Sequence, residues 1–307
     1  MLIVPDSYSS GLAGKLSDIS GIKISAPTIR RFPDAETYVR VGAVNGHDIV
    51  LVAQLYPGQN GRITELLLLA DALHDAGAKS IAAVIPYLPY ARQDKRFQDG
   101  EALSMKTVAK LLLSVGVTGL LCVDLHFHKK PETFDFHGVK CTNISAGKLL
   151  LDHVRSVYPG IEAIGPDLGS SEMIANATGK KAVMEKVKIC TNCGKRQSEC
   201  ACKGKDITYK VVTLKSDIEV RGKNVMILDD IISSGTTMLA AVDKLKESGA
   251  KKMIIGATHG LFLNNSLESL KAKADYLVVT DSVETACSKV SLAPLIAGSL
   301  KGLFKTH

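Results

Sequence analysis

The chain has 307 residues, 46% of them hydrophobic, and a formal net charge of +7. This length suits two domains, and the hydrophobic content is enough for sizeable cores. The chain has no Trp, only 5% aromatic residues and no basic block, which argues against base-stacking platforms and nucleic-acid stripes. The positive charge mildly favours anionic ligands.

The N-terminus and the cysteines indicate the compartment. Residues 1–6 predict a first strand and a turn rather than a signal peptide, and the apolar run 66–70 is too short for a membrane span. Four of the seven cysteines are bunched in one segment, and the other three are scattered and predicted to be buried thiols. We therefore expect a cytosolic protein with no nucleic-acid or membrane partner.

Strands alternate with amphipathic helices along most of the chain. The predicted elements of the first half are strands at 49–53, 80–86 and 120–124 and helices at 62–75 and 104–113. Later elements are short strands at 209–213 and 218–220 and a helical tail at 291–304 that can pack back on the first domain. This alternation is typical of α/β proteins with mostly parallel sheets flanked by helices.

The two halves of the chain resemble each other. Residues 71–84 match 243–256, each with a helix end, a glycine stop and a strand. Upstream of these segments, the predicted strand at 47–54 corresponds to the one at 223–230. We predict two like-folded domains that arose by internal duplication, at 1–147 and 148–307. The alternative is that the match reflects how common helix–glycine–strand units are.

A loop at 31–37 separates two short strand regions near the N-terminus. Phe32 could stack on a purine, and Asp34 and Glu36 could accept hydrogen bonds from the purine amino group or from a ribose. We interpret this loop as a candidate nucleotide contact.

The predicted strand at 80–86 runs into a loop that turns at two prolines. The loop presents Arg92 and Arg96, a lysine between them, and also Gln93 and Asp94. Arginine can grip phosphate oxygens with two parallel hydrogen bonds, so three cations at the mouth of an α/β sheet favour a polyphosphate. A solvated charged loop is the alternative.

Two more strand ends carry candidate metal-associated groups. His126 follows the strand that ends at residue 124 and could contact a phosphate or a water bound to Mg²⁺, although a structural histidine is the alternative. Asp167 follows a short strand at 163–164 and is another carboxylate at a strand mouth.

A predicted strand at 182–188 ends in Lys186 and Lys188. Side chains alternate along a strand, so both ammonium groups are expected on the same side. Two cations on one face suit the charge that builds up on a transferring phosphoryl group. The alternative is a solvated strand face.

Four cysteines follow this strand within thirteen positions. They are Cys190, Cys193, Cys200 and Cys202. Their C-x-x-C and C-x-C spacing, with glycine and no apolar pattern between, predicts a small tetrahedral zinc knuckle that orders a lid. Redox-active or merely free thiols are the alternatives.

The most informative motif is the segment 224–238, in which an apolar strand ends in Asp229 and Asp230 and a loop precedes a helix. The loop residues are Ser233, Ser234, Gly235, Thr236 and Thr237. Backbone N–H groups at such a turn suit a phosphate, whereas the carboxylates suit sugar hydroxyls or a hydrated Mg²⁺. We interpret the segment as a phosphosugar site; an ordinary turn with a Ser N-cap is the alternative.

In their order along nearly the whole chain, these motifs resemble those of the ribose-phosphate pyrophosphokinase family. The segments concerned are Phe32–Glu36, Pro89–Arg96, Val123–His126, Pro166–Gly169, Glu185–Lys186 and Asp229–Thr237. The resemblance implies two phosphoribosyltransferase-like domains. It also implies transfer of the diphosphoryl group of ATP to the C1 hydroxyl of ribose 5-phosphate, which gives phosphoribosyl diphosphate and AMP for nucleotide biosynthesis.

The resemblance also implies roles for single residues. The loop Ser233–Thr237 would hold the 5-phosphate, with the acidic pair on the ribose hydroxyls. The residues implied to bind ATP are Arg92, Gln93, Asp94 and Arg96, together with Phe32, Asp34 and Glu36 from a neighbouring subunit of an obligate homo-oligomer. His126 and Asp167 match Mg²⁺-associated positions. Lys186 matches the catalytic lysine, and Lys188 stands where many relatives have arginine.

Departures from the family pattern leave two alternatives open. Ser233 stands where bacterial relatives commonly have aspartate, Thr236 replaces a usual glycine, and the cysteine segment occupies the region of the family's mobile catalytic flap. A regulatory homologue that binds without catalysing is one alternative, against which Lys186 and the acidic pair argue. The other is a phosphoribosyltransferase, although that family lacks the Arg-Gln-Asp loop and the first half.

Overall fold

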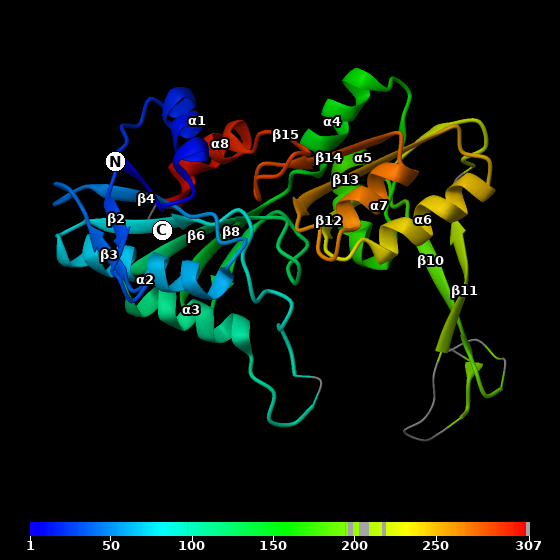
Figure 1. The fold of residues 1–307 in the computed structure, drawn as a ribbon, viewed down its shortest axis with the longest axis horizontal. Coiled ribbons are helices and arrows are strands. Elements are labelled where there is room, and N and C mark those ends of the chain that lie inside the picture. The colour runs from blue at the N-terminus through cyan, green and yellow to red at the C-terminus, as the bar shows by residue number, and fades with distance from the viewer. Residues whose placement is uncertain (97, 194, 196–198, 203–208, 217–218, 305–307) are drawn as a thin grey trace. The chain divides into compact units, whose positions relative to one another are not determined.

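Figure 1 shows the computed structural model of the chain, which describes residues 1–96, 98–193, 195, 199–202, 209–216 and 219–304. For residues 185–189 and 209–216 it describes the backbone only. The chain divides into two compact units, Met1–Ala146 with Thr280–His307, and Gly147–Val279. The second domain was predicted at 148–307, whereas in the structure Thr280–His307 belongs to the first unit.

The first unit is built on a six-stranded sheet with the order β1-β4-β5-β6-β8-β7. Its strands are β1 (Leu2–Pro5), β4 (Asp48–Val52), β5 (Ser80–Val84), β6 (Val117–Val123), β7 (Thr133–Phe136) and β8 (Val139–Ile144). All neighbours are parallel except β7, which runs antiparallel to β8. The central strands are buried almost throughout, as expected for strands that are covered on both faces and therefore form apolar runs.

Helices cover both faces of this sheet (Figure 1). Helices α2 (Gln59–Asp75) and α3 (Ser104–Ser114) lie on one face, and α1 (Ser10–Ser20) and α8 (Ala293–Leu303) pack together on the other. In α3, Met105, Val108, Ala109 and Leu112 are buried, and this spacing gives the helix one apolar face. A separate antiparallel hairpin is formed by β2 (Thr28–Arg31) and β3 (Thr37–Arg40).

A second sheet has five strands in the order β15-β14-β13-β12-β9. Its edge strand β15 (Ser288–Val290) lies in the segment 280–307 that is assigned to the first unit, whereas the second unit supplies β9 (Glu162–Ile164), β12 (Asn224–Ile232), β13 (Lys252–Gly260) and β14 (Tyr276–Thr280). The helices of the second unit are α4 (Gly147–Val157), η1 (Leu168–Ser170), α5 (Ser171–Thr178), α6 (Thr236–Glu247) and α7 (Ser266–Lys273). Neighbouring strands from β9 to β14 are parallel, so the predicted α/β class is confirmed in both units.

A long antiparallel hairpin, β10 (Met184–Cys190) and β11 (Tyr209–Ser216), also belongs to the second unit. The strand predicted at 218–220 is wrong for the two of its residues that the structure describes, because Glu219 and Val220 lie outside any strand; residue 218 lies outside the described residues. Here the chain turns: Gly222 has a φ of +73°, and the Lys223 amide donates to the Val220 carbonyl at 3.0 Å.

The two units share one local hydrogen-bond pattern at the predicted repeat. In the first unit, the Gly46 amide donates to the Gly77 carbonyl at 2.8 Å; in the second, Gly222 donates to Gly249 at 2.8 Å. Gly77 and Gly249 both have a positive φ, of +82° and +84°, where each helix stops before its strand. This likeness of backbone detail goes beyond a common helix-to-strand connection and supports internal duplication.

Within the part of the chain that the structure describes, no helix combines the length and the apolar character needed to cross a membrane.

Candidate active site

The loop between β12 and α6 is fixed from behind by the segment after β13. The Ser233 carbonyl accepts hydrogen bonds from the Leu263 amide at 2.9 Å and from Ser266 Oγ at 3.2 Å. Gly235 precedes α6 with a φ of +74°, and a Cβ at this position would lie 3.1 Å from Cβ of Ser266. Glycine therefore lets the loop approach α7 closely. The amides of the first turn of α6 have no intrahelical acceptor, which suits an anion.

Hydroxyl groups surround this helix start. Ser234 and Thr236 are exposed, with their Oγ and Oγ1 atoms 3.1 Å apart, and Ser233 and Thr237 are half-buried. The five loop residues that the sequence predicted thus lie together at one helix N-terminus, where backbone and side-chain donors can bind the same phosphate.

The acidic pair precedes this loop. It lies inside β12 rather than after its end, because the strand continues to Ile232. Asp230 is buried and Asp229 half-buried, and the Asp230 amide donates to Asp229 Oδ1 at 2.9 Å. Burial raises the pKa of Asp229 well above its ordinary value, and the charges of Asp230 and Asp167 raise it further. Asp230 and Asp167 thus lie close enough to Asp229 for their charges to act on it, and neighbouring carboxylates suit sugar hydroxyls or a divalent cation.

Asp167 is positioned by a tight turn after β9. Its Oδ1 atom accepts a hydrogen bond from the Gly169 amide at 2.9 Å, and its carbonyl accepts one from Ser170 Oγ at 2.7 Å. A Cβ at Gly165 would lie 2.1 Å from Ser170 Oγ, so only glycine allows this turn. Because β9 pairs with β12 in parallel, with Ile164 opposite Ile227, Asp167 and the acidic pair both follow soon after this paired position.

The predicted catalytic lysines lie on the long hairpin. Lys186 pairs with Leu214, and Lys188 pairs with Val211 after a register shift between Val187 and Lys188. The side chains of both lysines lie outside the described residues, so their expected common orientation stays a prediction. The base of the hairpin is anchored, because the Met184 amide donates to the Gly165 carbonyl at 2.9 Å and Met184 is fully buried.

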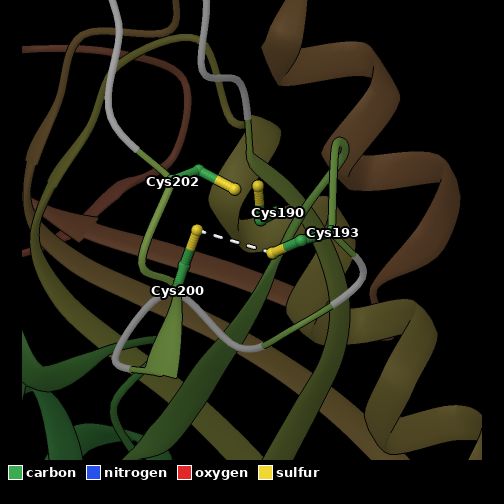
Figure 2. Close-up of side chains that lie close together, drawn as sticks. All are labelled: Cys190, Cys193, Cys200 and Cys202. Carbon is green, nitrogen blue, oxygen red and sulfur yellow. Dashed lines mark hydrogen bonds between the residues drawn. The ribbon is translucent and has the colours of Figure 1, made fainter.

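The four cysteines converge at the other end of this hairpin. Their sulfur atoms all lie within 4.8 Å of one another and point to a common centre (Figure 2). None of the seven cysteines, all of which lie in the described part of the chain, forms a disulfide. Hydrogen bonds with Cys193 and Cys200 raise the pKa of the Cys202 thiol to about 12. The cluster therefore keeps its thiol protons unless a bound cation replaces them.

In the first unit, the predicted polyphosphate loop lies between β5 and α3. Arg92, Asp94 and Arg96 are exposed, and Gln93 is half-buried. Three internal contacts shape the loop: Gln93 Nε2 donates to the Lys95 carbonyl at 3.1 Å and to Glu101 Oε2 at 3.2 Å, and Arg96 Nε donates to the Glu101 carbonyl at 2.7 Å.

His126 is exposed in the loop that follows β6. This loop is held by the buried Asn143, whose Oδ1 atom accepts from the Leu125 amide at 3.0 Å. The Asn143 Nδ2 atom donates to the carbonyls of His128 at 2.7 Å and Lys130 at 3.0 Å. One buried amide thus fixes the backbone on both sides of His126. Asn143 was not predicted from the sequence; the signal that it offers is a polar residue at a position where β8, with alternating burial, points inward.

Phe32, Asp34 and Glu36 are exposed at the turn of the β2–β3 hairpin. The turn is closed by a hydrogen bond of 2.8 Å from the Phe32 amide to the Glu36 carbonyl. Phe32 packs edge-on against Tyr38 at 5.9 Å, with the Arg30 guanidinium 5.0 Å from its ring centre. These two contacts fix the Phe32 ring, which stays exposed to a partner.

The site residues therefore form one set in each unit. The first unit holds the hairpin turn, the arginine loop and His126; the second holds the three carboxylates, the hydroxyl loop and the lysine hairpin. A carboxylate pair in a parallel strand before a phosphate-type loop defines an α/β protein of the phosphoribosyltransferase-like class.

Comparisons with known proteins agree with this class. A family model described as the N-terminal domain of ribose phosphate pyrophosphokinase matches residues 1–116, and a phosphoribosyl transferase domain model matches residues 205–294. The chain is 35% identical to the ribose-phosphate pyrophosphokinase of Thermococcus kodakarensis, over 90% of this chain and 92% of that protein. It is 33% identical to that of Pyrococcus furiosus, over 97% and 100%.

A solved structure is also similar over nearly the whole chain. The crystal structure of phosphoribosylpyrophosphate synthetase from Mycobacterium smegmatis superimposes with a TM-score of 0.77 and 26% identity, and covers 99% of this chain and 98% of that one. The chain belongs to the ribose-phosphate pyrophosphokinase family, and it is therefore an enzyme, as the order of its motifs predicted.

Proposed function

We propose that this enzyme transfers the diphosphoryl group of ATP to the C1 hydroxyl of ribose 5-phosphate and releases phosphoribosyl diphosphate and AMP. The observation that carries the proposal is the acidic pair of β12 beside the helix N-terminus of α6. This arrangement offers acceptors for sugar hydroxyls and donors for a phosphate at adjacent places.

Ribose 5-phosphate would bind wholly within the second unit. The amides and hydroxyls of Ser233–Thr237 would hold the 5-phosphate, while Asp229 and Asp230 accept hydrogen bonds from the ribose hydroxyls. Burial and, after it, the charges of Asp230 and Asp167 raise the pKa of Asp229, and sugar donors would offset both effects. Binding would thus favour the ionised acidic pair.

ATP would bind through the first unit. The exposed Arg92 and Arg96 suit its phosphates, and Gln93 and Asp94 lie in the same loop. Phe32, Asp34 and Glu36 stand exposed at a hairpin turn, where they could reach the nucleotide of a neighbouring subunit. We therefore propose a homodimer as the smallest active unit, with tetramers or hexamers as possible larger assemblies.

Mg²⁺ fits the donors on this chain. The charge of Asp167 acts on Asp229, so the two carboxylates lie near each other, and carboxylate oxygens are ligands that Mg²⁺ prefers. We propose Asp167 of the second unit and the exposed His126 of the first unit as residues that each associate with Mg²⁺. Bound Mg²⁺ would neutralise negative charge on the phosphate oxygens of ATP.

Lys186 and Lys188 would stabilise the charge on the transferring group. Little covalent chemistry is needed from the protein in such a transfer, so positioning and electrostatics set the rate. Lys188 offers a point charge where arginine would offer two parallel hydrogen bonds.

We further propose that the four cysteines hold a structural Zn²⁺. We also propose that the enzyme works in the cytosol, where its seven thiols would stay reduced.

The function is tested by measuring AMP formation from ATP, ribose 5-phosphate and Mg²⁺. We expect Lys186→Ala to lower kcat about 100-fold or more, with the Kd of ribose 5-phosphate within about threefold of wild type. Lys251→Ala, which removes an exposed lysine of the same unit, is the matched control and should leave both unchanged.

Three outcomes would count against the proposal. Unchanged kcat in Lys186→Ala would remove this lysine from the mechanism. Binding of ribose 5-phosphate without AMP formation in the wild type would indicate a regulatory homologue. Consumption of phosphoribosyl diphosphate with a nucleobase, without its synthesis, would indicate a phosphoribosyltransferase.

A further inference from the structure

The end of the β10–β11 hairpin contains a cluster of thiols that the transfer reaction does not require. Cys190 is the last residue of β10 and is buried, whereas Cys193, Cys200 and Cys202 lie in the connection to β11. Figure 2 shows the four sulfur atoms facing a common centre. Because its residues come from both ends of the connection between β10 and β11, the cluster can hold these two ends together.

The spacing of the sulfur atoms suits one metal ion. Four thiolates at Zn–S distances of about 2.3 Å in a tetrahedron have sulfur atoms about 3.8 Å apart. In this chain every pair lies within 4.8 Å, and the Cys193 and Cys200 sulfur atoms are 3.6 Å apart. The latter distance is far longer than a disulfide bond of about 2.05 Å.

The local backbone is already folded as such a site requires. The Cys190 amide donates a hydrogen bond of 2.8 Å to the Lys195 carbonyl, which turns the chain so that Cys193 comes back towards Cys190. Among the described residues of 191–202, none is buried, so no apolar core holds this segment. A metal ion would supply the order that hydrophobic packing does not.

The ligand set selects the metal. Four soft thiolates exclude Mg²⁺ and Ca²⁺, which prefer oxygen, and a closed tetrahedral set is typical of structural zinc. No described aspartate, glutamate or histidine completes the cluster, so none of its four positions is left for a water or a substrate.

The position of the cluster connects it with catalysis. Strand β10 is anchored at its start, where Met184 is buried and bonded to Gly165, and the cysteines lie at its other end. Lys186 and Lys188 lie between these two points, and β10 and β11 pair continuously from Met184 and Ser216 to Cys190 and Tyr209 apart from one register shift. Fixing both ends of a two-stranded ribbon fixes its register and twist, which are otherwise weakly held.

We infer that Zn²⁺ bound by Cys190, Cys193, Cys200 and Cys202 orders the β10–β11 hairpin and thereby positions its lysines, so that phosphoryl transfer depends on the metal. The metal binding itself is independent of the proposed function; the dependence of turnover on the metal rests on it. The zinc acts on the strand and does not contact substrate.

Metal binding is tested on the full-length enzyme purified under reducing conditions with zinc supplied. We expect one zinc ion per chain by elemental analysis, and tetrahedral Co²⁺–thiolate absorption bands after Co²⁺ exchange. Cys193→Ser and Cys200→Ser should each lose the metal. Cys287→Ala, which removes a thiol outside the cluster, should retain it. A protein without zinc, one that prefers an iron–sulfur cluster, or a Cys193–Cys200 disulfide in the reduced preparation would overturn the inference.

Coupling to catalysis is tested with the same variants by two further measurements. We expect loss of zinc to speed amide hydrogen exchange in 184–190 and 209–216, and to lower kcat at least tenfold. The Kd of ribose 5-phosphate, which binds at β12, should stay unchanged. Zinc loss with unaltered exchange and kcat would overturn the coupling. If the wild type lacked transfer activity altogether, the proposed function would fail, while the zinc content and exchange data would still decide the metal site.

Discussion

Asp229, which we propose to bind ribose hydroxyls, shows how such a residue can oppose folding. Its pKa is raised by burial first and then by the charges of Asp230 and Asp167, so the folded state favours the protonated form. A raised carboxyl pKa stabilises the fold fully below the ordinary value of 3.8, and this contribution is lost as the pH rises through the raised pKa. As the pH rises above this ordinary value, Asp229 therefore contributes progressively less to the stability of the apo protein.

Replacing Asp229 by asparagine should make this visible. Asparagine keeps the oxygen that accepts from the Asp230 amide but carries no charge. We expect Asp229→Asn to have a Tm about 2 °C or more above wild type at pH 8, with the difference shrinking towards pH 4, and weaker binding of ribose 5-phosphate. Thermal unfolding at both pH values is the measurement, and Asp243→Asn, on the exposed side of α6, is the control. A lower Tm for Asp229→Asn at pH 8 would contradict the argument.

At Gly235, we expect the backbone conformation to affect the binding of ribose 5-phosphate. Alanine there would adopt a φ of +74°, at about 1–2 kcal/mol, and its Cβ would lie 3.1 Å from Ser266 Cβ and 3.2 Å from Leu270 Cδ1. We expect Gly235→Ala to shift the loop and weaken ribose 5-phosphate binding about tenfold, as measured by calorimetry. Gly179→Ala is a matched control with a φ of +76° and no atom within 4 Å, so it should lose stability without loss of binding. Equal affinities for the two variants would contradict this role.

At the scale of elements, Asp281 fixes the start of α8. It is buried and accepts hydrogen bonds from Lys15 Nζ at 2.8 Å, Ser291 Oγ at 2.8 Å and the Leu292 amide at 2.7 Å. Its carbonyl accepts from Gln54 Nε2 at 2.7 Å. One residue thus ties the C-terminal segment to both α1 and the end of β4.

Removing this carboxylate should loosen the whole segment. We expect Asp281→Ala to lower the free energy of unfolding by about 2–3 kcal/mol, because it leaves buried donors without their charged acceptor. Asp281→Asn keeps an oxygen for the Leu292 amide and should lose less. Urea unfolding of both variants is the measurement, and equal losses would show that the hydrogen bond to the helix start is unimportant.

Equivalent elements in the two units have diverged in chemistry. Ala53 and Gln54 follow β4 at the places that correspond to Asp229 and Asp230 in β12, and Gln54 is as buried as Asp230, at 6% exposure. Gln54 Nε2 donates a hydrogen bond to the Asp281 carbonyl. At these corresponding places, the second unit has carboxylates and the first unit does not.

At the scale of the whole molecule, the chain has two units that each contain a sheet, and the proposed sugar site lies in one of them. A ligand that binds only one unit should stabilise that unit, by about 2.7 kcal/mol at 100 times its Kd. With ribose 5-phosphate alone, we therefore expect slower amide exchange within 147–279 and unchanged exchange within 1–146. Protection spread equally over both ranges, as measured by mass spectrometry, would contradict a sugar site confined to the second unit.

Much of the fold followed from sequence patterns. Buried parallel strands such as β4 and β12 form apolar runs, and α3 has helical spacing of its apolar residues, so their type was predictable. Boundaries were less predictable: β12 continues past its acidic pair, because pairing with β13 as far as Ile232 outweighs the local polarity. The roles assigned to individual site residues stay predictions.

The sequence by itself determined the α/β class, the family and the residue types at each strand end, because periodicity and motif order depend on local chemistry. Only the tertiary structure decided that Asp167 lies close enough to Asp229 to affect its pKa, that Asn143 and Ser266 hold two of the loops, and that four sulfur atoms share one centre. These features join residues that are distant in sequence. Distances and burial between such residues arise from strand pairing and packing, which no local pattern records.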